Sequence, residues 1–190
     1  MRNFKPLALL LAVGLIATAC KEDPVSLYPL FDDQTQTFNP GLIGTWAKKG
    51  SDETWEFTSG AKKTYRLTIT THSNPSGEEL EFEAGLVELA GKFFLDLRSY
   101  NTAPTDAPGH VFVRIDLDGD SLSIGFLDEK WLKERLGRES YMTHIEANGK
   151  LVLTTPTRDL QYFFRNYAWD NAAFPPDDDE ALHRVPQEIH

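Results

Sequence analysis

The chain has 190 residues, of which 41% are hydrophobic and 12% aromatic, a composition that is typical of a globular protein with one main domain. Its 29 acidic and 19 basic side chains give a formal net charge of -10. This balance argues against nucleic-acid binding, because phosphate recognition requires a basic surface, and against electrostatic adhesion to anionic lipid.

The N-terminal segment has the features of a secretory signal peptide. Arg2 and Lys5 supply positive charge at its start, and an apolar stretch over residues 7–17 follows. This stretch is too short for an ordinary membrane-spanning helix. We therefore expect residues 1–19 to be removed from the mature protein and to take no part in the fold.

Ala17, Thr18, Ala19 and Cys20 close this segment. They resemble the lipobox of bacterial lipoproteins, in which the cysteine becomes the acylated first residue. Cys20 is the only cysteine, so it has no disulfide partner within the chain. The resemblance implies a lipoprotein that carries acyl chains such as palmitate on Cys20, is anchored in a membrane and faces the periplasm. Lys21 follows, and by resemblance to enterobacterial sorting it favours the outer over the inner membrane. The alternative is an unmodified signal peptide with a cysteine nearby.

Residues 20–40 are expected to comprise the lipidated cysteine and a tether to the folded domain. They contain three prolines and four acidic residues and show little periodicity. Their apolar residues exceed what a linker needs, so part of the segment is expected to dock on the domain. These residues are Val25, Leu27, Tyr28, Leu30 and Phe31.

Alternating apolar and polar residues predict seven short strands between residues 42 and 126, separated by turn-rich gaps. This spacing is typical of an antiparallel barrel or sandwich and not of βαβ units. In the fourth segment, residues 79–84 alternate strictly between glutamate and apolar side chains. Gly85 interrupts the alternation and the apolar positions move to Val87 and Leu89, which predicts a β-bulge at the glycine.

Two helices and one hairpin are predicted after these strands. Asp128 is a suitable N-cap for a helix over residues 128–136, and Gly137 fits its end. The dipeptide Asn148-Gly149 predicts a hairpin over residues 143–154. A second helix with one apolar face is predicted over residues 158–168. Residues 169–190 contain a run of four acidic side chains and are expected to form a disordered tail.

Gly44, Thr45 and Trp46 open the first predicted strand. They resemble the Gly-x-Trp motif of the lipocalin and calycin superfamily, in which the tryptophan closes one barrel end beneath an arginine that follows the last strand. The resemblance covers residues 41–168 and implies that Trp46 and Arg158 form this barrel end. A helix before the last hairpin and the absence of the family's cysteines depart from the superfamily pattern.

The expected fold class is therefore mainly β. It is a lipocalin-like, antiparallel up-and-down barrel of about eight strands, with one helix before the last hairpin and one C-terminal helix. Closing such a sheet buries its apolar face and removes exposed edges. An open β-sandwich or half-barrel is the alternative.

The sequence offers no motif for catalysis or for a metal or other cofactor. The five histidines do not occur at metal-ligand spacings. The chain contains no Gly-x-Ser-x-Gly elbow, and its single cysteine is assigned to the anchor. Acidic residues such as Glu81, Glu83 and Asp96 lie opposite the apolar rows and are expected on the solvated surface. We therefore expect a protein that is not an enzyme, needs no cofactor and binds no metal.

Side chains that point into the predicted barrel form the candidate ligand site. They are Trp55, Tyr65, Leu67, Phe82, Phe93 and Phe126. An eight-stranded barrel is wide enough either to be filled by side chains or to hold one small ligand. We interpret the chain as a lipid-anchored cell-envelope protein whose barrel binds a small apolar ligand. The alternative is a filled barrel that serves as a non-catalytic interaction or scaffold module of an envelope protein complex.

Overall fold

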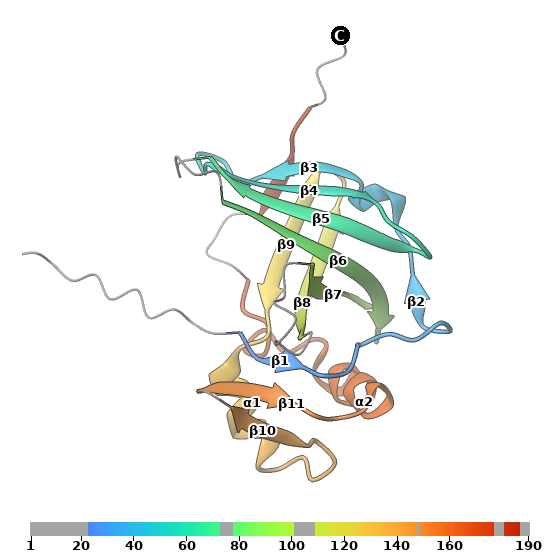
Figure 1. Ribbon diagram of the computed structural model, residues 1–190, viewed down its shortest axis with the longest axis vertical. Coiled ribbons are helices and arrows are strands. Elements are labelled where there is room, and N and C mark those ends of the chain that lie inside the picture. Colours follow the sequence, from blue (N-terminus) through green and yellow to red (C-terminus); the bar gives the residue numbers. More distant parts are fainter. Residues whose placement is uncertain (1–22, 73–77, 101–108, 148, 177–180, 187–190) are drawn as a thin grey trace, which may run out of the picture.

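The computed structural model describes residues 23–72, 78–100, 109–147, 149–176 and 181–186. Figure 1 shows a β-barrel with a smaller unit of two helices and a hairpin beneath it. The predicted mainly-β fold with two helices is confirmed. The proposed signal segment and Cys20 lie outside the described residues.

A closed barrel of eight antiparallel strands forms the larger part of the molecule. Around the barrel the strands are β3 (Gly44–Ala47), β4 (Glu53–Ser59), β5 (Thr64–Thr71), β6 (Glu78–Leu89), β7 (Lys92–Ser99), β8 (His110–Asp118), β9 (Ser121–Phe126) and β12 (Leu182–Arg184). The sheet closes on itself because β12 pairs with β9 on one side and with β3 on the other. The predicted closed barrel is confirmed, and the fold is not the open sandwich.

The eighth strand comes from a segment for which the sequence predicted disorder. Leu182 is buried in the barrel core, and His183 pairs with Ser121 of β9 and Ala47 of β3. Phe174, upstream of this strand, is also buried. The predicted disordered tail is therefore wrong for residues 169–176 and 181–186. Backbone pairing and a few apolar anchors hold this otherwise polar segment in place.

The predicted hairpin exists, but it lies outside the barrel. β10 (His144–Ala147) and β11 (Lys150–Leu153) pair with each other, and β11 pairs in parallel with β1 (Val25–Ser26). α1 (Glu129–Leu136) precedes the hairpin and α2 (Thr157–Tyr167) follows it, so the whole unit is inserted between β9 and β12. Within the described ranges, both helices are too short and too polar for a membrane span.

The N-terminal segment is part of the fold from residue 23 onward. β2 (Gln36–Thr37) pairs with β6, and the short 3-10 helix η1 (Pro40–Leu42) leads into β3. Leu30 is fully buried in an apolar core that lies beneath the barrel, between the barrel wall and the two helices. Its amide nitrogen donates a hydrogen bond to Asp96 Oδ2. The expected docking of part of residues 20–40 on the domain is therefore observed, and from residue 23 onward the segment is packed and hydrogen-bonded and does not form a free tether.

Two apolar cores share the barrel wall. One fills the barrel, and the other lies between the outer faces of β6, β7 and β8 and the helix–hairpin unit. Leu86 belongs to the inner core, whereas Val87 and Leu89 belong to the outer one. The predicted bulge is wrong, because β6 pairs with β7 without interruption from Phe82 to Leu89 and with β5 as far as Gly85. The apolar pattern changes after Gly85 because the outer face of β6 is covered there by the second core, so that outward-facing positions become apolar as well.

Arg114 fastens the helix–hairpin unit to the barrel. It lies on the outer face of β8, is 8% exposed, and donates to the carbonyl oxygens of Ala168 at 3.2 Å and Phe174 at 3.0 Å. It also donates to the Asn171 side chain at 2.9 Å. Burial lowers the pKa of the Arg114 guanidinium. These bonds satisfy the carbonyl group of the α2 C-cap residue, which has no partner within the helix, and hold the segment that follows α2.

Candidate functional site

One end of the barrel is sealed by Trp46 and an arginine. The Trp46 ring is fully buried, and its Nε1 donates to the Leu42 carbonyl oxygen at 2.9 Å. The Arg184 guanidinium lies 4.2 Å from the centre of this ring, a cation–π contact. It also donates to the carbonyl oxygens of Gly41 at 2.6 Å and Ile43 at 2.7 Å. Arg184 therefore ties the last strand to the chain that enters the first.

The arginine over Trp46 is Arg184, and the prediction of Arg158 is wrong. Arg158 lies on α2, where it lines a surface hollow together with Tyr162. The error follows from taking the hairpin for the end of the barrel. Gly44 has a φ of +129°, and a Cβ there would lie 2.7 Å from Arg184 Nη1. Glycine is thus required at the first position of the Gly-x-Trp pattern by its backbone conformation and by this close approach.

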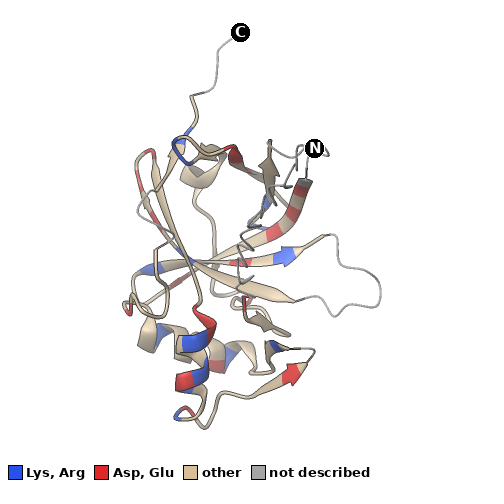
Figure 2. Cartoon of the chain, turned by 90° about the vertical axis from the view of Figure 1, so that its left-hand side faces the viewer, with Lys and Arg blue, Asp and Glu red and all other residues tan. Residues whose placement is uncertain are grey.

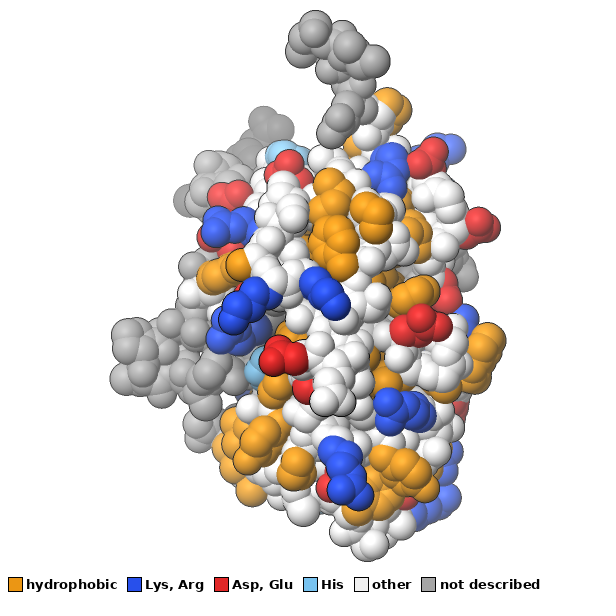
Figure 3. All heavy atoms as spheres, turned by 90° about the vertical axis from the view of Figure 1, so that its right-hand side faces the viewer, with side chains coloured by type: hydrophobic (Ala, Val, Ile, Leu, Met, Phe, Trp, Pro, Cys, Tyr) orange, Lys and Arg blue, Asp and Glu red, His pale blue; other side chains and the backbone are white. Residues whose placement is uncertain are grey.

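Tyr65 helps to close the same barrel end. Its ring is fully buried and stacks on Phe38 with 4.8 Å between ring centres. The Tyr65 hydroxyl accepts from the Asn39 backbone nitrogen at 2.6 Å and donates to the Asn39 carbonyl oxygen at 3.0 Å. Burial raises the pKa of this hydroxyl above its ordinary value. Tyr65 thereby holds the segment before η1 over the barrel end. Figure 3 shows the side of the molecule on which β2 and α2 lie in Figure 1, where hydrophobic and charged side chains are interspersed.

All six candidate ligand residues belong to the core inside the barrel. Three are buried (Trp55, Tyr65, Leu67) and three are half-buried (Phe82, Phe93, Phe126). Trp55 and Phe126 face each other from different strands, with ring centres 6.5 Å apart and planes inclined by 69°. The structure brings the six residues into one cluster but distributes them along the barrel axis.

The strand directions divide these residues between the two barrel ends. Tyr65 and Phe93 are the second residues of β5 and β7, which start at the sealed end. Trp55 is the direct cross-strand partner of Trp46 and lies between the two ends, whereas Phe126 is the last residue of β9 and lies toward the opposite end. Phe82 also lies near this end, early in β6. Figure 2 looks toward this opposite end of the molecule.

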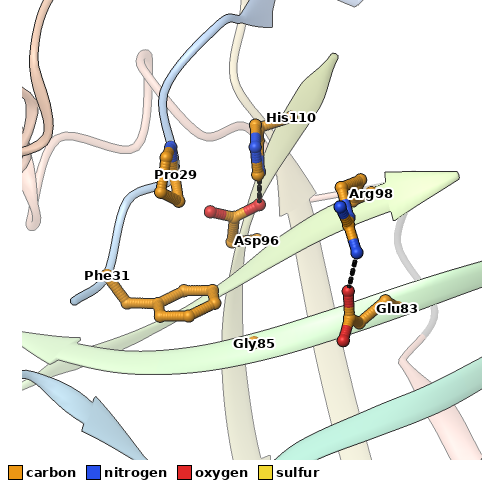
Figure 4. Close-up of a pocket in the computed structure, with 7 residues that line it drawn as sticks. All are labelled: Pro29, Phe31, Glu83, Gly85, Asp96, Arg98 and His110. Atoms are coloured by element: carbon orange, nitrogen blue, oxygen red, sulfur yellow. Dashed lines mark hydrogen bonds and ion pairs between the residues drawn. The ribbon is translucent and has the colours of Figure 1, made fainter. Parts of the chain in front are cut away.

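A polar pocket lies on the outside of the barrel, beneath the N-terminal segment (Figure 4). Its volume is about 280 Å³, and it is lined by Pro29, Phe31, Glu83, Gly85, Asp96, Arg98 and His110. Asp96 is 1% exposed and accepts hydrogen bonds from the Leu30 nitrogen at 2.7 Å and from His110 Nδ1 at 2.6 Å. Because a carboxylate oxygen accepts, the imidazole proton in this contact is on Nδ1.

The other side chains of the polar pocket are paired as well. Arg98 forms an ion pair with Glu83, and the Phe31 ring lies against Gly85, where a Cβ would be 2.0 Å from Phe31 Cε1. None of the seven lining residues is a serine, threonine or cysteine that could act as a nucleophile. The arrangement is therefore suited to holding residues 29–31 on the barrel wall.

Sequence reasoning missed Asp96, His110 and Arg184. Asp96 was expected on the solvated surface, and this is wrong because the segment around Leu30 covers it. One signal was present in the sequence, since Phe94 shares the outer face of β7 with Asp96 and an aromatic residue there indicates a covered wall. Arg184 carried no signal because its strand has only three residues.

Metal-ligating side chains do not converge in the described part of the chain. No group of three or more His, Cys, Asp or Glu residues there is arranged to hold a metal ion. No protein-family model matches the sequence, and no curated protein or solved structure matches it significantly. Function is therefore inferred from the barrel geometry and from the motif at Cys20.

Proposed function

We propose that this chain is a lipid-anchored lipoprotein of the bacterial cell envelope whose barrel binds a small apolar ligand. Acylation of Cys20 would hold it in a membrane, with the outer membrane favoured and the domain facing the periplasm. The ligand would bind at the barrel end opposite Tyr65 and η1. The protein would act by binding and not by catalysis.

The observation that carries the ligand proposal is the difference between the two barrel ends. Trp46, Arg184 and Tyr65 seal one end by stacking and hydrogen bonds. At the other end, Phe82 and Phe126 point inward and are half-buried. Half-buried aromatic side chains at a barrel mouth offer an apolar ligand a surface that loses water on binding.

The competing function is an interaction module with a filled barrel. Aromatic rings follow one another through the interior at centre-to-centre distances of 4.8, 6.1, 6.4 and 6.5 Å. The rings are Phe38, Tyr65, Phe57, Trp55 and Phe126, in that order. This packing limits a ligand to the region near Trp55 and Phe126. A scaffold protein would co-purify with a stoichiometric envelope partner and bind no small molecule.

Titration with a fluorescent fatty acid tests the ligand proposal. Phe126→Ala should weaken binding about five- to thirtyfold, because it removes roughly 1–2 kcal/mol of apolar contact. Phe93→Ala is the matched control, since Phe93 is also half-buried and points inward but lies near the sealed end. It should change the Kd by less than about twofold. Equal losses in both variants, or no saturable binding by the wild type, would refute a ligand site at this end.

Processing in a bacterial host tests the anchor. Cys20→Ala should abolish both fatty-acid labelling and signal cleavage, because the lipobox cysteine is the residue that is acylated. The protein should then remain as an unprocessed precursor on a gel. Normal processing of the Cys20→Ala variant would contradict lipidation.

A further inference from the structure

A small exposed apolar face lies where the N-terminal segment joins the fold. It is the outer face of the sheet formed by β10, β11 and β1. Val25, Val152 and Ile145 form one row across these strands, since Val25 pairs with Val152 and Val152 with Ile145. Leu151 and Leu153, which alternate with Val152, are buried in the core beneath the barrel, so the Val152 row faces away from the molecule.

The side chains on this face are unusually exposed for apolar residues. Ile145 is 51% exposed and Leu27, just beyond β1, is 42% exposed. Val25 and Val152 are half-buried between them. Of the described residues of β10 and β11, Glu146 is the only acidic one, and it alternates with Ile145. Glu146 on β10 and Lys150 on β11 are the charged side chains of this hairpin among its described residues, and Figure 2 shows it mostly in tan. In a chain with a net charge of -10, this face is therefore apolar and nearly free of negative charge.

The distance to the proposed anchor restricts what can cover this face. Cys20 precedes Asp23, the first described residue, by three positions, and a fully extended chain spans at most about 3.6 Å per residue. The two residues are thus at most about 11 Å apart, and Cys20 and Val25 at most about 18 Å. An acylated Cys20 lies at the bilayer surface, so β1 must lie within this distance of it.

We infer that the outer face of the β10–β11–β1 sheet lies against the surface of the lipid bilayer. This inference rests on the proposed lipidation of Cys20, and its occupant is the bilayer to which Cys20 is anchored. Leu27 and Ile145 contact the boundary between headgroups and acyl chains, as the apolar faces of interfacial elements do. The attraction is apolar, which agrees with the acidic net charge and requires no anionic lipid.

Site-specific fluorescence on the acylated protein tests this orientation. The probe is NBD attached to Ile145→Cys in protein reconstituted into phosphatidylcholine vesicles with and without nitroxide-labelled lipid. Acylation consumes the Cys20 thiol, so only the new cysteine is labelled. Tyr162→Cys is the matched control, because Tyr162 is 55% exposed and lies on α2, whose buried side packs in the same core as Leu151. Tyr162 is not part of the β10–β11–β1 sheet.

We expect NBD at position 145 to emit at shorter wavelength with vesicles and to be quenched several-fold more by nitroxide lipid than NBD at position 162. Equal emission and quenching at the two positions would overturn the inference, provided mass spectrometry shows acylated Cys20. A shift at position 145 without vesicles, with cross-linked dimers, would also overturn it, because a second copy would then cover the face. Protein without acyl chains would instead refute the proposed anchor itself.

Discussion

Gly85→Ala tests how the N-terminal segment is held against the barrel wall. An added Cβ at Gly85 would lie 2.0, 2.6 and 2.6 Å from Cε1, Cδ1 and Cζ of Phe31. Carbon atoms prefer separations of about 3.5–4 Å, so the ring would have to move by about 1.5–2 Å or β6 would have to bend. Overpacking of this kind costs about 1–3 kcal/mol, and we expect Gly85→Ala to lower the free energy of unfolding by this amount.

Phe31→Ala provides the background in which the clash is absent. Alone, Phe31→Ala removes a partly buried ring. It should therefore lower the free energy of unfolding by less than the 3–5 kcal/mol that is typical of replacing a fully buried phenylalanine. In this background, alanine at position 85 should be favourable by about 0.5–1 kcal/mol, because glycine is a poor strand former.

The difference between the two backgrounds predicts a coupling energy of about 1.5–4 kcal/mol between the two substitutions. Equilibrium urea unfolding of the four proteins, followed by far-ultraviolet circular dichroism, measures it. If Gly85→Ala costs the same in both backgrounds to within ~0.5 kcal/mol, then Phe31 is not the reason for the glycine.

Substitutions at Arg114, Tyr141 and Arg184 test contacts of the helix–hairpin unit and the sealed barrel end. Arg114→Met should lower the free energy of unfolding by about 3–5 kcal/mol, because it leaves buried carbonyl oxygens near the end of α2 without a donor. Arg114→Lys should cost less, and urea unfolding measures both. Burial, together with the nearby Glu139 carboxylate, raises the pKa of the Tyr141 hydroxyl to about 12. Its contribution to stability is therefore complete below pH 10 and is lost as the pH rises toward 12. Tyr141→Phe should remove this alkaline loss, so that the free energy of unfolding of the variant falls less between pH 8 and pH 11 than that of the wild type, as urea denaturation at the two pH values would reveal. Arg184→Gln should lower the free energy of unfolding by about 2–4 kcal/mol and shift the fluorescence of Trp46 to longer wavelength, because the cation–π contact and two hydrogen bonds are lost. The surface control Arg158→Gln should change the free energy of unfolding by less than ~0.5 kcal/mol.

Most of the barrel could be predicted from the sequence because each long strand has one covered face. In β5, Tyr65 and Leu67 face the core while Arg66 faces solvent, and this alternation is visible in the sequence. The eighth strand could not be found in this way. It has only three residues, which is too short for a period of two to stand out among the surrounding prolines and acidic residues.

The predictions at β6 and β7 failed where the outer wall of the barrel is covered. A strand that is buried on both faces loses its alternation, so the apolar residues Val87 and Leu89 predict a bulge at Gly85 that β6 does not have. Asp96 was assigned to solvent for the same reason, since its covering segment lies 66 residues earlier in the chain. Burial by a segment so distant in the chain leaves no pattern in the residues around Asp96.

The position of β12 determines the order in which the chain can fold. The barrel closes when β12 pairs with β9 and β3. Because β9 ends at Phe126 and β12 begins at Leu182, this pairing is possible only after the inserted helix–hairpin unit has been synthesised. The seven preceding strands join along the sequence by local hairpins, whereas the last pairing must close a long loop. Until then β3 and β9 have exposed edges, which are sites for association with other chains. Barrel closure is therefore a late step, and a chain that lacks residues 181–186 should aggregate and not fold into a smaller barrel.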